Sequence, residues 1–469
     1  MRTIFVLGTG PLLEPGTTVI SGQCLRTTHF VQPLLDAGHR VELMTVPIPG
    51  TTDDSLDPPI AEAVFGALRY RRLTSNAAHR ILPVIRAAIE ALRSDALFGI
   101  NAGPACLLAE LARPEPLWAD LNGWTMAEGL VRAARLGHDR DYDHFWRQEA
   151  ITLLRAARFS TVSDRQSDAL SGELAMLGAL TRERFSGDFV CTIPNAVHPA
   201  YATLERASGV PDFLADRLPA DAQICLWSGG FNSWTDLELL TDAMARAFEE
   251  LPRLYFVCTG GAVHGHDEKT YADFQRLAAE RFPAGRCLML GWVDFPQVLQ
   301  LHAAATLGLN IDSANVETRF GARNRLTNML GAGLPVVTTR GTEIAEWTEK
   351  NDAGVVVPAG DVTALAAALI AGARDAAEGE ARAVSARAAA LRDFLPANTV
   401  APLLAWLASG PAPRPLPDPD GPAAHLRDFL LARCQMERPF RDPVLVPEPP
   451  VPVSFARRLV RRIRRITGA

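Results

Sequence analysis

One short stretch of the sequence gathers groups that bind anions. Residues 317–339, ETRFGARNRLTNMLGAGLPVVTT, place Glu317 ahead of Arg319, Arg323 and Arg325, which fall just before and inside an expected short helix. A helix start already presents unpaired N–H groups and the positive end of the helix dipole. Arginines there add little to folding, but they bind an anion such as a diphosphate through charge-assisted hydrogen bonds. A solvated helix face is the alternative interpretation.

Pairs of glycines follow two expected strands near this stretch. Gly229 and Gly230 end the segment QICLWSGG, and Gly260 and Gly261 end RLYFVCTGG. Glycine allows the backbone to approach an anion closely. The second pair is equally compatible with a plain tight turn after a strand.

Composition excludes several classes of protein. A chain of 469 residues exceeds one ordinary core, so two domains are expected. The net charge of -6 argues against a general nucleic-acid binder. The seven cysteines form no Cys-x-x-Cys pair and the ten histidines show no ligand spacing, so we expect no metal site. Gly8 and Gly10 lack the third glycine of a dinucleotide fingerprint, which disfavours NAD.

The order of expected elements predicts an α/β protein with two doubly wound halves. The segment TIFVLG is a buried strand rather than a signal peptide, and a glycine-rich loop, a helix ending at Gly38 and the strand RVELMTV follow it. The second half restarts with the strand QICLWSGG and a helix from Thr235, its expected N-cap. Two such halves imply a cleft between them, where such sheets place ligands. No apolar run is long enough to span a bilayer.

Several segments, in order, resemble a known family. The second half resembles the retaining, group-1 (family-4-like) glycosyltransferases with the GT-B fold. The segments that carry the resemblance are LWSGGFNSWTDLELL, LYFVCTGG, LMLGWVDFPQVLQLHAAATLGLNID and SANVETRFGARNRLTNMLGAGLPVVTT. SGQCLRTTHFVQPLLDAGHRVELMT and TIPNAVHPAY fit the same pattern in the first half. The resemblance implies an acceptor-side Rossmann-like domain at 1–215 and a sugar-nucleotide domain at 216–395. Residues 396–469 would form an extension of a helix, Pro-rich linkers and a basic tail.

The resemblance also implies roles for individual residues. Glu317 would contact the donor sugar, and Arg323 and Arg325 would stabilise the charge that builds on the departing diphosphate. The donor would further be bound by residues from both halves, namely Gly22, Gly229, Gly230, Gly260, Gly261, Trp292, Val293, Arg319 and Asn328. No metal or other cofactor would be needed besides the nucleotide-diphosphate sugar itself.

Two departures from the family pattern affect the donor site. The acid that usually holds the ribose hydroxyls is replaced by Asn328, about three residues farther from Glu317 than is usual. The loop FNSWTD, at 231–236, carries no cation where the family has an Arg and a Lys. We therefore expect the arginines at 319–325 to offset the diphosphate charge, with Arg26 adding charge across the cleft.

On the acceptor side, LWADLNGWTMAEG holds Asn122 where the family often has a His. Asp120 lies two residues earlier, so both side chains would share one face of a strand. We expect Asn122 and Arg26 to bind the acceptor, and Asp120 to bind its hydroxyl group or to act as a weak base. A cap at the strand end is an equal alternative for Asp120. A front-face retaining reaction needs no strong base, because the leaving phosphate takes the proton.

The C-terminal tail indicates a membrane surface. In residues 454–469, apolar positions such as Phe455, Leu459 and Ile463 share one helical face, and six arginines cover the rest. This pattern is typical of a helix lying in a membrane interface with anionic headgroups. A disordered basic end or a helix docked on the first domain is the alternative. The sequence thus predicts a cytoplasmic protein held at the inner face of the cytoplasmic membrane.

The predicted function is sugar transfer from a nucleotide-diphosphate sugar to a glycan or lipid-linked acceptor, with retention, in cell-surface polysaccharide or glycoconjugate synthesis. The missing loop cations and Asn328 keep a second class open, a non-catalytic GT-B relative that acts as a nucleotide- or partner-binding scaffold. A sugar phosphorylase with the same fold is a third. Nucleic acid is not an expected partner.

Overall fold

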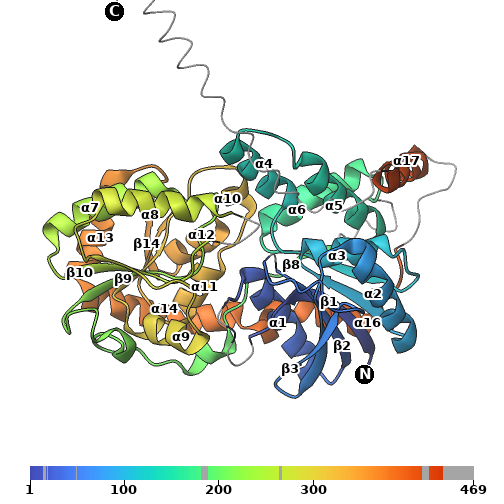
Figure 1. The fold of residues 1–469 in the computed structure, drawn as a ribbon, viewed down its shortest axis with the longest axis horizontal. Helices are drawn as coiled ribbons and strands as arrows, with labels where there is room; N and C mark the ends of the chain where they lie inside the picture. Colours follow the sequence, from blue (N-terminus) through green and yellow to red (C-terminus); the bar gives the residue numbers. More distant parts are fainter. Residues whose placement is uncertain are drawn as a thin grey trace, which may run out of the picture.

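Two α/β units lie side by side in the computed structural model (Figure 1). The structure describes residues 1–13, 17, 19–48, 50–180, 189–262, 267–414 and 422–436. Each unit is built on one mostly parallel sheet with helices on both faces. The predicted pair of doubly wound, Rossmann-like domains is confirmed.

The first domain contains an eight-stranded sheet in the order β3-β4-β2-β1-β5-β6-β7-β8. Its strands are β1 Thr3–Gly10, β2 Arg40–Pro47, β3 Ile60–Phe65, β4 Leu68–Leu73, β5 Ala96–Ile100, β6 Leu117–Leu121, β7 Arg158–Thr161 and β8 Val190–Thr192. Only the β3–β4 hairpin is antiparallel. The helices are α1 Gly22–Asp36, α2 Ala78–Leu92, α3 Ala102–Glu110, α4 Thr125–Leu136, α5 Tyr142–Arg155 and α6 Asp164–Met176.

The second domain contains a six-stranded parallel sheet in the order β11-β10-β9-β12-β13-β14. Its strands are β9 Gln223–Trp227, β10 Leu254–Cys258, β11 Cys287–Met289, β12 Leu307–Asn310, β13 Val336–Thr339 and β14 Gly354–Val357. The helices are α7 Leu237–Glu250, α8 Lys269–Arg281, α9 Phe295–Ala304, α10 Val316–Phe320, α11 Asn324–Gly331, α12 Glu343–Lys350, α13 Val362–Arg374 and α14 Ala376–Phe394. The N-cap of α7 is Asp236, one residue after the predicted Thr235, because its side chain accepts from the Leu239 N–H.

The chain crosses between the domains twice, so their packing differs from the predicted bounds. Val197 and Tyr201 already pack in the core of the second domain, ahead of the predicted boundary at residue 215. After α14, the short helices α15 Pro396–Thr399 and α16 Ala401–Ser409 lead back to the first domain. There Leu403 and Trp406 join its core, and the Trp406 ring lies 5.2 Å from that of Trp118. Residues up to 409 therefore close the first domain rather than begin a separate extension.

Contacts across the interface fix the two domains relative to one another. The Glu343 carboxylate, on α12, accepts the backbone N–H groups of Asp164 and Arg165 at the start of α6, at 3.0 and 2.8 Å. An acid at a helix N-terminus satisfies unpaired N–H groups and the helix dipole. Near it, the rings of Trp124 and Phe320 meet edge to face at 4.9 Å. These contacts hold α4 and α6 against α10 and α12.

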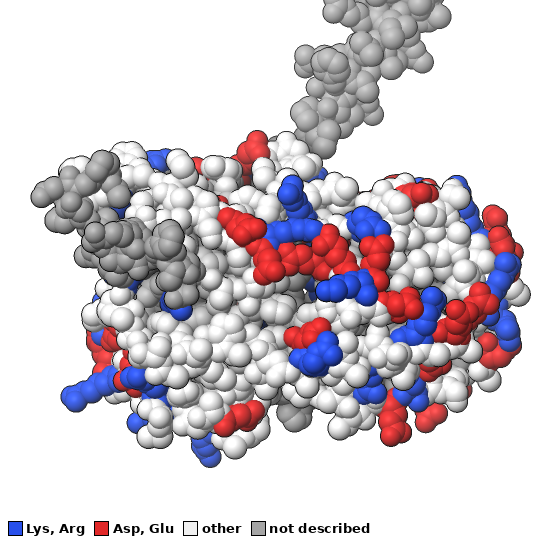
Figure 2. Space-filling view, turned by 180° about the vertical axis from the view of Figure 1, so that it is seen from behind, with Lys and Arg blue, Asp and Glu red and all other residues white. Residues whose placement is uncertain are grey.

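The C-terminal part of the described chain lies on the first domain. Helix α17, Pro422–Met436, packs against α5, and Arg147 Nε donates to the Cys434 carbonyl at 3.0 Å. The basic tail predicted to bind a membrane, residues 454–469, lies outside the described residues. On the face shown in Figure 2, acidic and basic side chains are intermixed rather than gathered into a field of one sign.

A buried ion pair lies inside the first domain. Arg26 on α1 binds Asp120 on β6 through two hydrogen bonds, Nε–Oδ2 at 3.0 Å and Nη2–Oδ1 at 2.7 Å, and both side chains are fully buried. Arg26 Nη1 donates to the Pro194 carbonyl, and Ser160 Oγ donates to Asp120. With every strong polar atom satisfied, the pair acts as a polar staple between α1, β6 and the end of β8.

Arg26→Ala is expected to destabilise the first domain by about 3–5 kcal/mol, because it leaves the buried Asp120 carboxylate without its cation. Urea unfolding monitored by circular dichroism measures the change. Arg374→Ala removes a pair with Glu250 that is about half exposed and serves as the control, with a change below about 1 kcal/mol. Equal stability losses in the two variants would contradict the role given to the pair.

Candidate active site

A cavity of about 440 Å³ lies between the two domains, at the carboxyl ends of strands from both sheets. Parallel α/β sheets bind ligands at this edge. The first domain contributes the segment around Gly22, and Asn122 and Glu128 after β6. The second contributes the loops after β9, β10 and β11 and the start of α11. A ligand in this cavity therefore touches both domains at once.

Glycines form the wall of the cavity beside β9 and β10. Gly229 and Gly260 have φ of 100° and 73°, in the left-handed region that favours glycine. A Cβ at Gly260 would lie 2.5 Å from the carbonyl carbon of Gly229. The two glycine loops are thus packed backbone against backbone, which leaves their main chain open to a ligand.

Arg325 joins this wall to α11. Its Nε donates to the Ser228 carbonyl at 2.6 Å, its Nη2 donates to the Gly230 carbonyl, and its guanidinium lies 3.7 Å from the centre of the Trp227 ring. Burial lowers the pKa of Arg325 to about 9, so the side chain stays largely charged at neutral pH. Within the described residues, Nη1 has no hydrogen-bond partner. Arg325 thus presents a desolvated positive charge beside the glycines.

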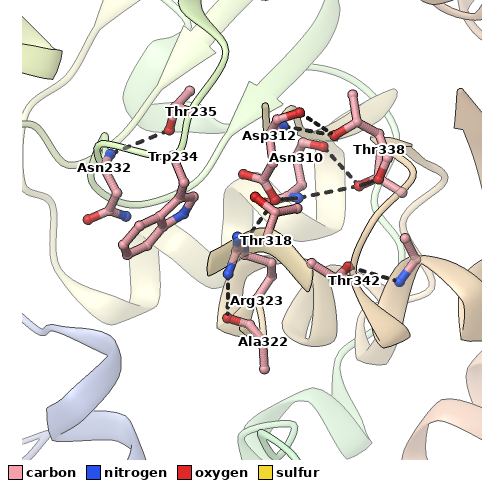
Figure 3. A network of polar contacts seen from close by, with 12 residues as sticks. Asn232, Trp234, Thr235, Asn310, Asp312, Thr318, Ala322, Arg323, Thr338 and Thr342 are labelled. Atoms are coloured by element: carbon pink, nitrogen blue, oxygen red, sulfur yellow. Dashed lines mark hydrogen bonds and ion pairs between the residues drawn. The ribbon is translucent and has the colours of Figure 1, made fainter. Parts of the chain in front are cut away.

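Arg323 lies between two acids, Asp312 and Glu317, in the floor of the cavity. Figure 3 shows Arg323 and Asp312. Its Nη1 and Nη2 bind the two carboxylate oxygens of Glu317 at 2.9 and 2.7 Å, and its Nε binds Asp312 at 2.8 Å. Burial by itself would lower the pKa of Arg323, but Asp312 and Glu317 raise it above the ordinary value. Burial raises the pKa of Glu317, and Arg323 opposes that rise. The group carries one negative charge when both acids are ionised.

A polar network ties this triad to the sheet (Figure 3). Asn310 Nδ2 donates to Asp312 at 2.9 Å, and the Asp312 N–H donates to Thr339 Oγ1 at 2.8 Å. A Cβ at Gly321 would lie 2.3 Å from Glu317 Oε1 and 2.5 Å from Arg323 Nη1. Gly321 therefore lets the chain turn between α10 and α11 close over the Glu317–Arg323 pair.

The cavity brings together most of the predicted residues. Those that line it are Gly22, Asn122, Gly229, Gly230, Gly260, Trp292, Val293, Glu317, Arg323, Arg325 and Asn328. Asn122 Nδ2 donates to Asn101 Oδ1 at 3.0 Å, and Asn328 Oδ1 accepts the His198 N–H at 3.1 Å. The side-chain carbonyl of Asn328 is therefore occupied by a hydrogen bond within the protein.

Four predicted residues are not in the lining. Arg319 is exposed on α10, because the expected single helix is broken after Phe320 and Arg319 lies on the short piece before the break. Gly261 faces the ring of Tyr271. Arg26 and Asp120 are consumed by their mutual ion pair. The strand ends at Leu121, so Asp120 is buried in the sheet while Asn122 lies beyond it, and the predicted shared face does not form.

Several residues of the site were not predicted. Glu128, in the first turn of α4, lines the cavity, and the buried Asp312, which follows β12, binds the lining residue Arg323. Both residues follow buried strands that end at the cleft. This position in the sequence could have identified them as candidate site residues. Buried polar atoms without a hydrogen-bond partner in the described structure also belong to lining residues, namely Asn195 Oδ1, His302 Nε2 and Asn310 Oδ1. Such atoms are costly unless a ligand or water binds them.

Within the described ranges, no group of three or more His, Cys, Asp or Glu residues is arranged to hold a metal ion.

Part of the chain is similar in sequence to a known protein family. Residues 222–375 match the family model described as glycosyl transferases group 1. Among curated protein sequences, none matches the chain.

Solved structures share the fold at low sequence identity. Sucrose-phosphate synthase from Thermosynechococcus elongatus has a TM-score of 0.66 and 17% identity, covering 87% of this chain and 100% of that one. HepE of Anabaena, in complex with UDP-glucose, has a TM-score of 0.60 and 16% identity, with the same coverage. A UDP-forming trehalose-phosphate synthase from Burkholderia vietnamiensis has a TM-score of 0.60 and 14% identity, covering 87% and 98%. The chain thus has the GT-B fold, and its residues 222–375 are similar to the group 1 glycosyl transferases.

Proposed function

We propose that the protein transfers a sugar from a nucleotide-diphosphate sugar to an acceptor hydroxyl group. The observation that carries this proposal is the meeting of Arg325, the glycine loops and the Glu317–Arg323 pair in one cavity between the domains. A departing diphosphate needs fixed positive charge, and a transferred sugar needs hydrogen-bond acceptors for its hydroxyl groups. The matched family and the UDP and UDP-glucose complexes of a structural neighbour support this assignment.

Arg325 replaces the cations that the loop at 231–236 lacks. Its Nε and Nη2 donate to the carbonyls of Ser228 and Gly230, just before this loop, so the guanidinium is fixed in place before any ligand binds. A charge fixed in a buried position needs no reorganisation as the leaving oxygen becomes negative. Its free Nη1 is the group that would bind the diphosphate.

Glu317 would accept hydrogen bonds from the donor sugar. Arg323 holds both of its carboxylate oxygens, and each oxygen retains a lone pair for a hydroxyl group. Arg323 itself acts as a positioning residue, because its side chain donates hydrogen bonds to Glu317, Asp312 and the Ala322 carbonyl. Asn328, with its amide nitrogen, would take the ribose, and the segment at Trp292 and Val293 would take the base.

We infer a retaining, front-face reaction in which the acceptor oxygen attacks from the side that the diphosphate leaves. The acceptor proton then passes to a diphosphate oxygen, so the protein need not supply a strong base. Because Asp120 is locked to Arg26, it is not assigned a catalytic role in this proposal.

Arg325→Ala is expected to lower turnover with a UDP-sugar donor by more than tenfold, about 1.4 kcal/mol of transition-state stabilisation. Donor hydrolysis across common nucleotide sugars, with and without acceptors, measures it. Arg319→Ala removes an exposed arginine outside the cavity and is expected to keep wild-type rates. Equal rates in both variants would show that Arg325 does not act on the leaving group. Nucleotide binding without turnover for any donor would instead indicate a non-catalytic relative.

Gly260→Ala is expected to weaken UDP binding at least tenfold, because the added Cβ would displace the Gly229–Gly230 backbone. Isothermal titration calorimetry with UDP measures the affinity. Gly285→Ala is the matched control, since Gly285 also has a positive φ, of 78°, but its Cβ would meet nothing within 4 Å. The Gly285→Ala control introduces only the strain of a positive φ. A similar loss of UDP affinity in both variants would show that the contact between the added Cβ and the Gly229–Gly230 backbone is not the cause.

We further propose that the enzyme works at the inner face of the cytoplasmic membrane, in the synthesis of a cell-surface polysaccharide or glycoconjugate. The support is the sequence of residues 454–469, in which apolar and arginine positions alternate as on an interfacial helix and no acid occurs. A Pro-rich segment at 442–453 precedes it and would serve as a tether. Among the helices of the described residues, none combines the length and apolar character that crossing a bilayer requires.

Co-sedimentation with liposomes tests the tail. The full-length protein is expected to bind vesicles that contain anionic lipid and to bind neutral vesicles much less, because arginines interact with anionic headgroups. A chain that ends at residue 453 is the control and is expected to stay in the supernatant. Binding by both chains, or by neither, would overturn the proposal.

A further inference from the structure

The two walls of the cavity differ in charge. The second domain contributes Arg325 and the Glu317–Arg323 ion pair, whereas within the described part of the chain no Lys or Arg of the first domain lines the cavity. The first-domain lining consists of Leu13, Ile20, Ser21, Gly22, Gln23, Leu25, Ile48, Asn122, Gly123, Glu128 and Asn195. Residues 14–16, 18 and 49, which interrupt this part of the described chain, are Glu, Pro, Gly, Thr and Pro in the sequence.

The arginine nearest in sequence to this wall cannot serve an anion. Arg26 follows Leu25 on α1, but it is fully buried and its guanidinium bonds go to Asp120 and the Pro194 carbonyl. Bringing a phosphate or carboxylate group against this wall would therefore desolvate it without a compensating cation. Such burial of an unpaired charge is strongly unfavourable.

Among the described residues of this wall, Glu128 is the one ionisable side chain. Its helix, α4, packs against α10, which carries Glu317 in the opposite domain. Its Oε1 lies against the backbone of Gly123, where a Cβ would come within 2.5 Å of it. The structure records no hydrogen bond from its carboxyl group to another described residue. Glu128 thus offers a free carboxyl group across the cleft from the donor-side acid.

The surroundings of Glu128 favour its neutral form. Burial and the nearby Glu317 raise its pKa to about 8, and Arg323, which is paired with Glu317, only partly opposes them. Glu149, on α5, lies near Glu128 within the first domain. Burial also raises the pKa of Glu149 to about 8. A protonated carboxyl group both donates and accepts one hydrogen bond, which matches a hydroxyl group.

We propose that the first-domain wall binds an uncharged acceptor with an apolar face, and that Glu128 holds the hydroxyl group that attacks. The apolar face would pack on Leu13, Ile20, Leu25 and Ile48. This inference rests on the proposed function and names the class of its acceptor. It excludes sugar phosphates and other anionic acceptors at this wall.

The transfer balances without a change in Glu128. The acceptor oxygen forms a bond to the anomeric carbon, and the bond from that carbon to the diphosphate breaks, with its electron pair going to the diphosphate oxygen. The acceptor proton passes to the diphosphate. Glu128 keeps its own proton and orients the acceptor oxygen, so its loss would affect the use of acceptor rather than of donor.

An acceptor panel tests the class. The full-length enzyme is given its best donor together with n-octyl glycosides of common hexoses or with the corresponding hexose 6-phosphates, and nucleoside diphosphate release is measured. The glycosides are expected to stimulate release with a kcat/KM at least tenfold above that of the phosphates. Equal or better use of the phosphates, or no stimulation by any glycoside, would overturn the proposal.

Substitutions test the residue. Glu128→Ala is expected to lower kcat/KM for the glycoside at least tenfold, while Glu128→Gln, which keeps a neutral hydrogen-bonding group, loses less than threefold. Since the protonated form is the active one, wild-type activity should fall above about pH 8, and the Gln variant should lack that fall. Glu62→Gln, an exposed acid on β3, is the control and should retain the wild-type profile. Similar activity in the Ala variant and the wild type would remove Glu128 from the acceptor site.

Donor hydrolysis without acceptor separates this inference from the proposed function. It should be unchanged within twofold in the Glu62→Gln control, and circular dichroism shows whether both Glu128 variants are folded. If the wild type neither binds UDP nor hydrolyses any nucleotide sugar, the proposed function fails. If hydrolysis is normal but hexose phosphates are preferred, only the acceptor assignment fails.

Discussion

The buried guanidinium of Arg323 holds the centre of this molecule together. It joins Asp312, which follows β12, to Glu317 on α10, and Arg323 itself occupies the N-cap position of α11. Each of these acids would be costly to bury alone, and together they stabilise the charge of Arg323. The turn at Gly321 and the Asn310 and Thr339 bonds all serve this arrangement. The floor of the cavity therefore depends on one ion triad.

A second consequence of the triad is a division of labour between neighbouring arginines. Because Arg323 is fully used by its acids, Arg325 is left to face the glycine loops, where its Nε and Nη2 hold two carbonyl groups. Cation placement on a helix instead of a loop gives the charge a rigid support. The loop at 231–236 carries no cation. Trp234 from this loop packs near Arg323, whose Cζ lies 5.0 Å from the centre of the Trp234 ring.

The two domains contribute unequal chemistry to the shared cavity. The cation Arg325 comes from the second domain, and the first domain offers apolar side chains, amides and the carboxyl group of Glu128. The first domain keeps its own nearby arginine inside the core, where it connects α1 to β6. A ligand with an anionic half and a neutral half is complementary to such a cavity in only one orientation. The contacts of Glu343 and Trp124 across the interface hold the walls at the spacing that this requires.

The sequence by itself determined the two α/β halves, most strands and the glycine turns that follow two of them. Hydrophobic periodicity and the conformations open to glycine are local properties of the chain. It also placed Glu317, Arg325 and Asn122 in the cleft, since residues that follow parallel strands meet at one edge. Only the tertiary structure decided which charges are free. Arg26 and Asp120 are 94 residues apart and found one another in the core. Arg319 was separated from its neighbours by the break after α10, and Glu128 met Glu317 only through the packing of α4 on α10. Ion pairing depends on distances between segments remote in sequence, and no spacing along the chain encodes them.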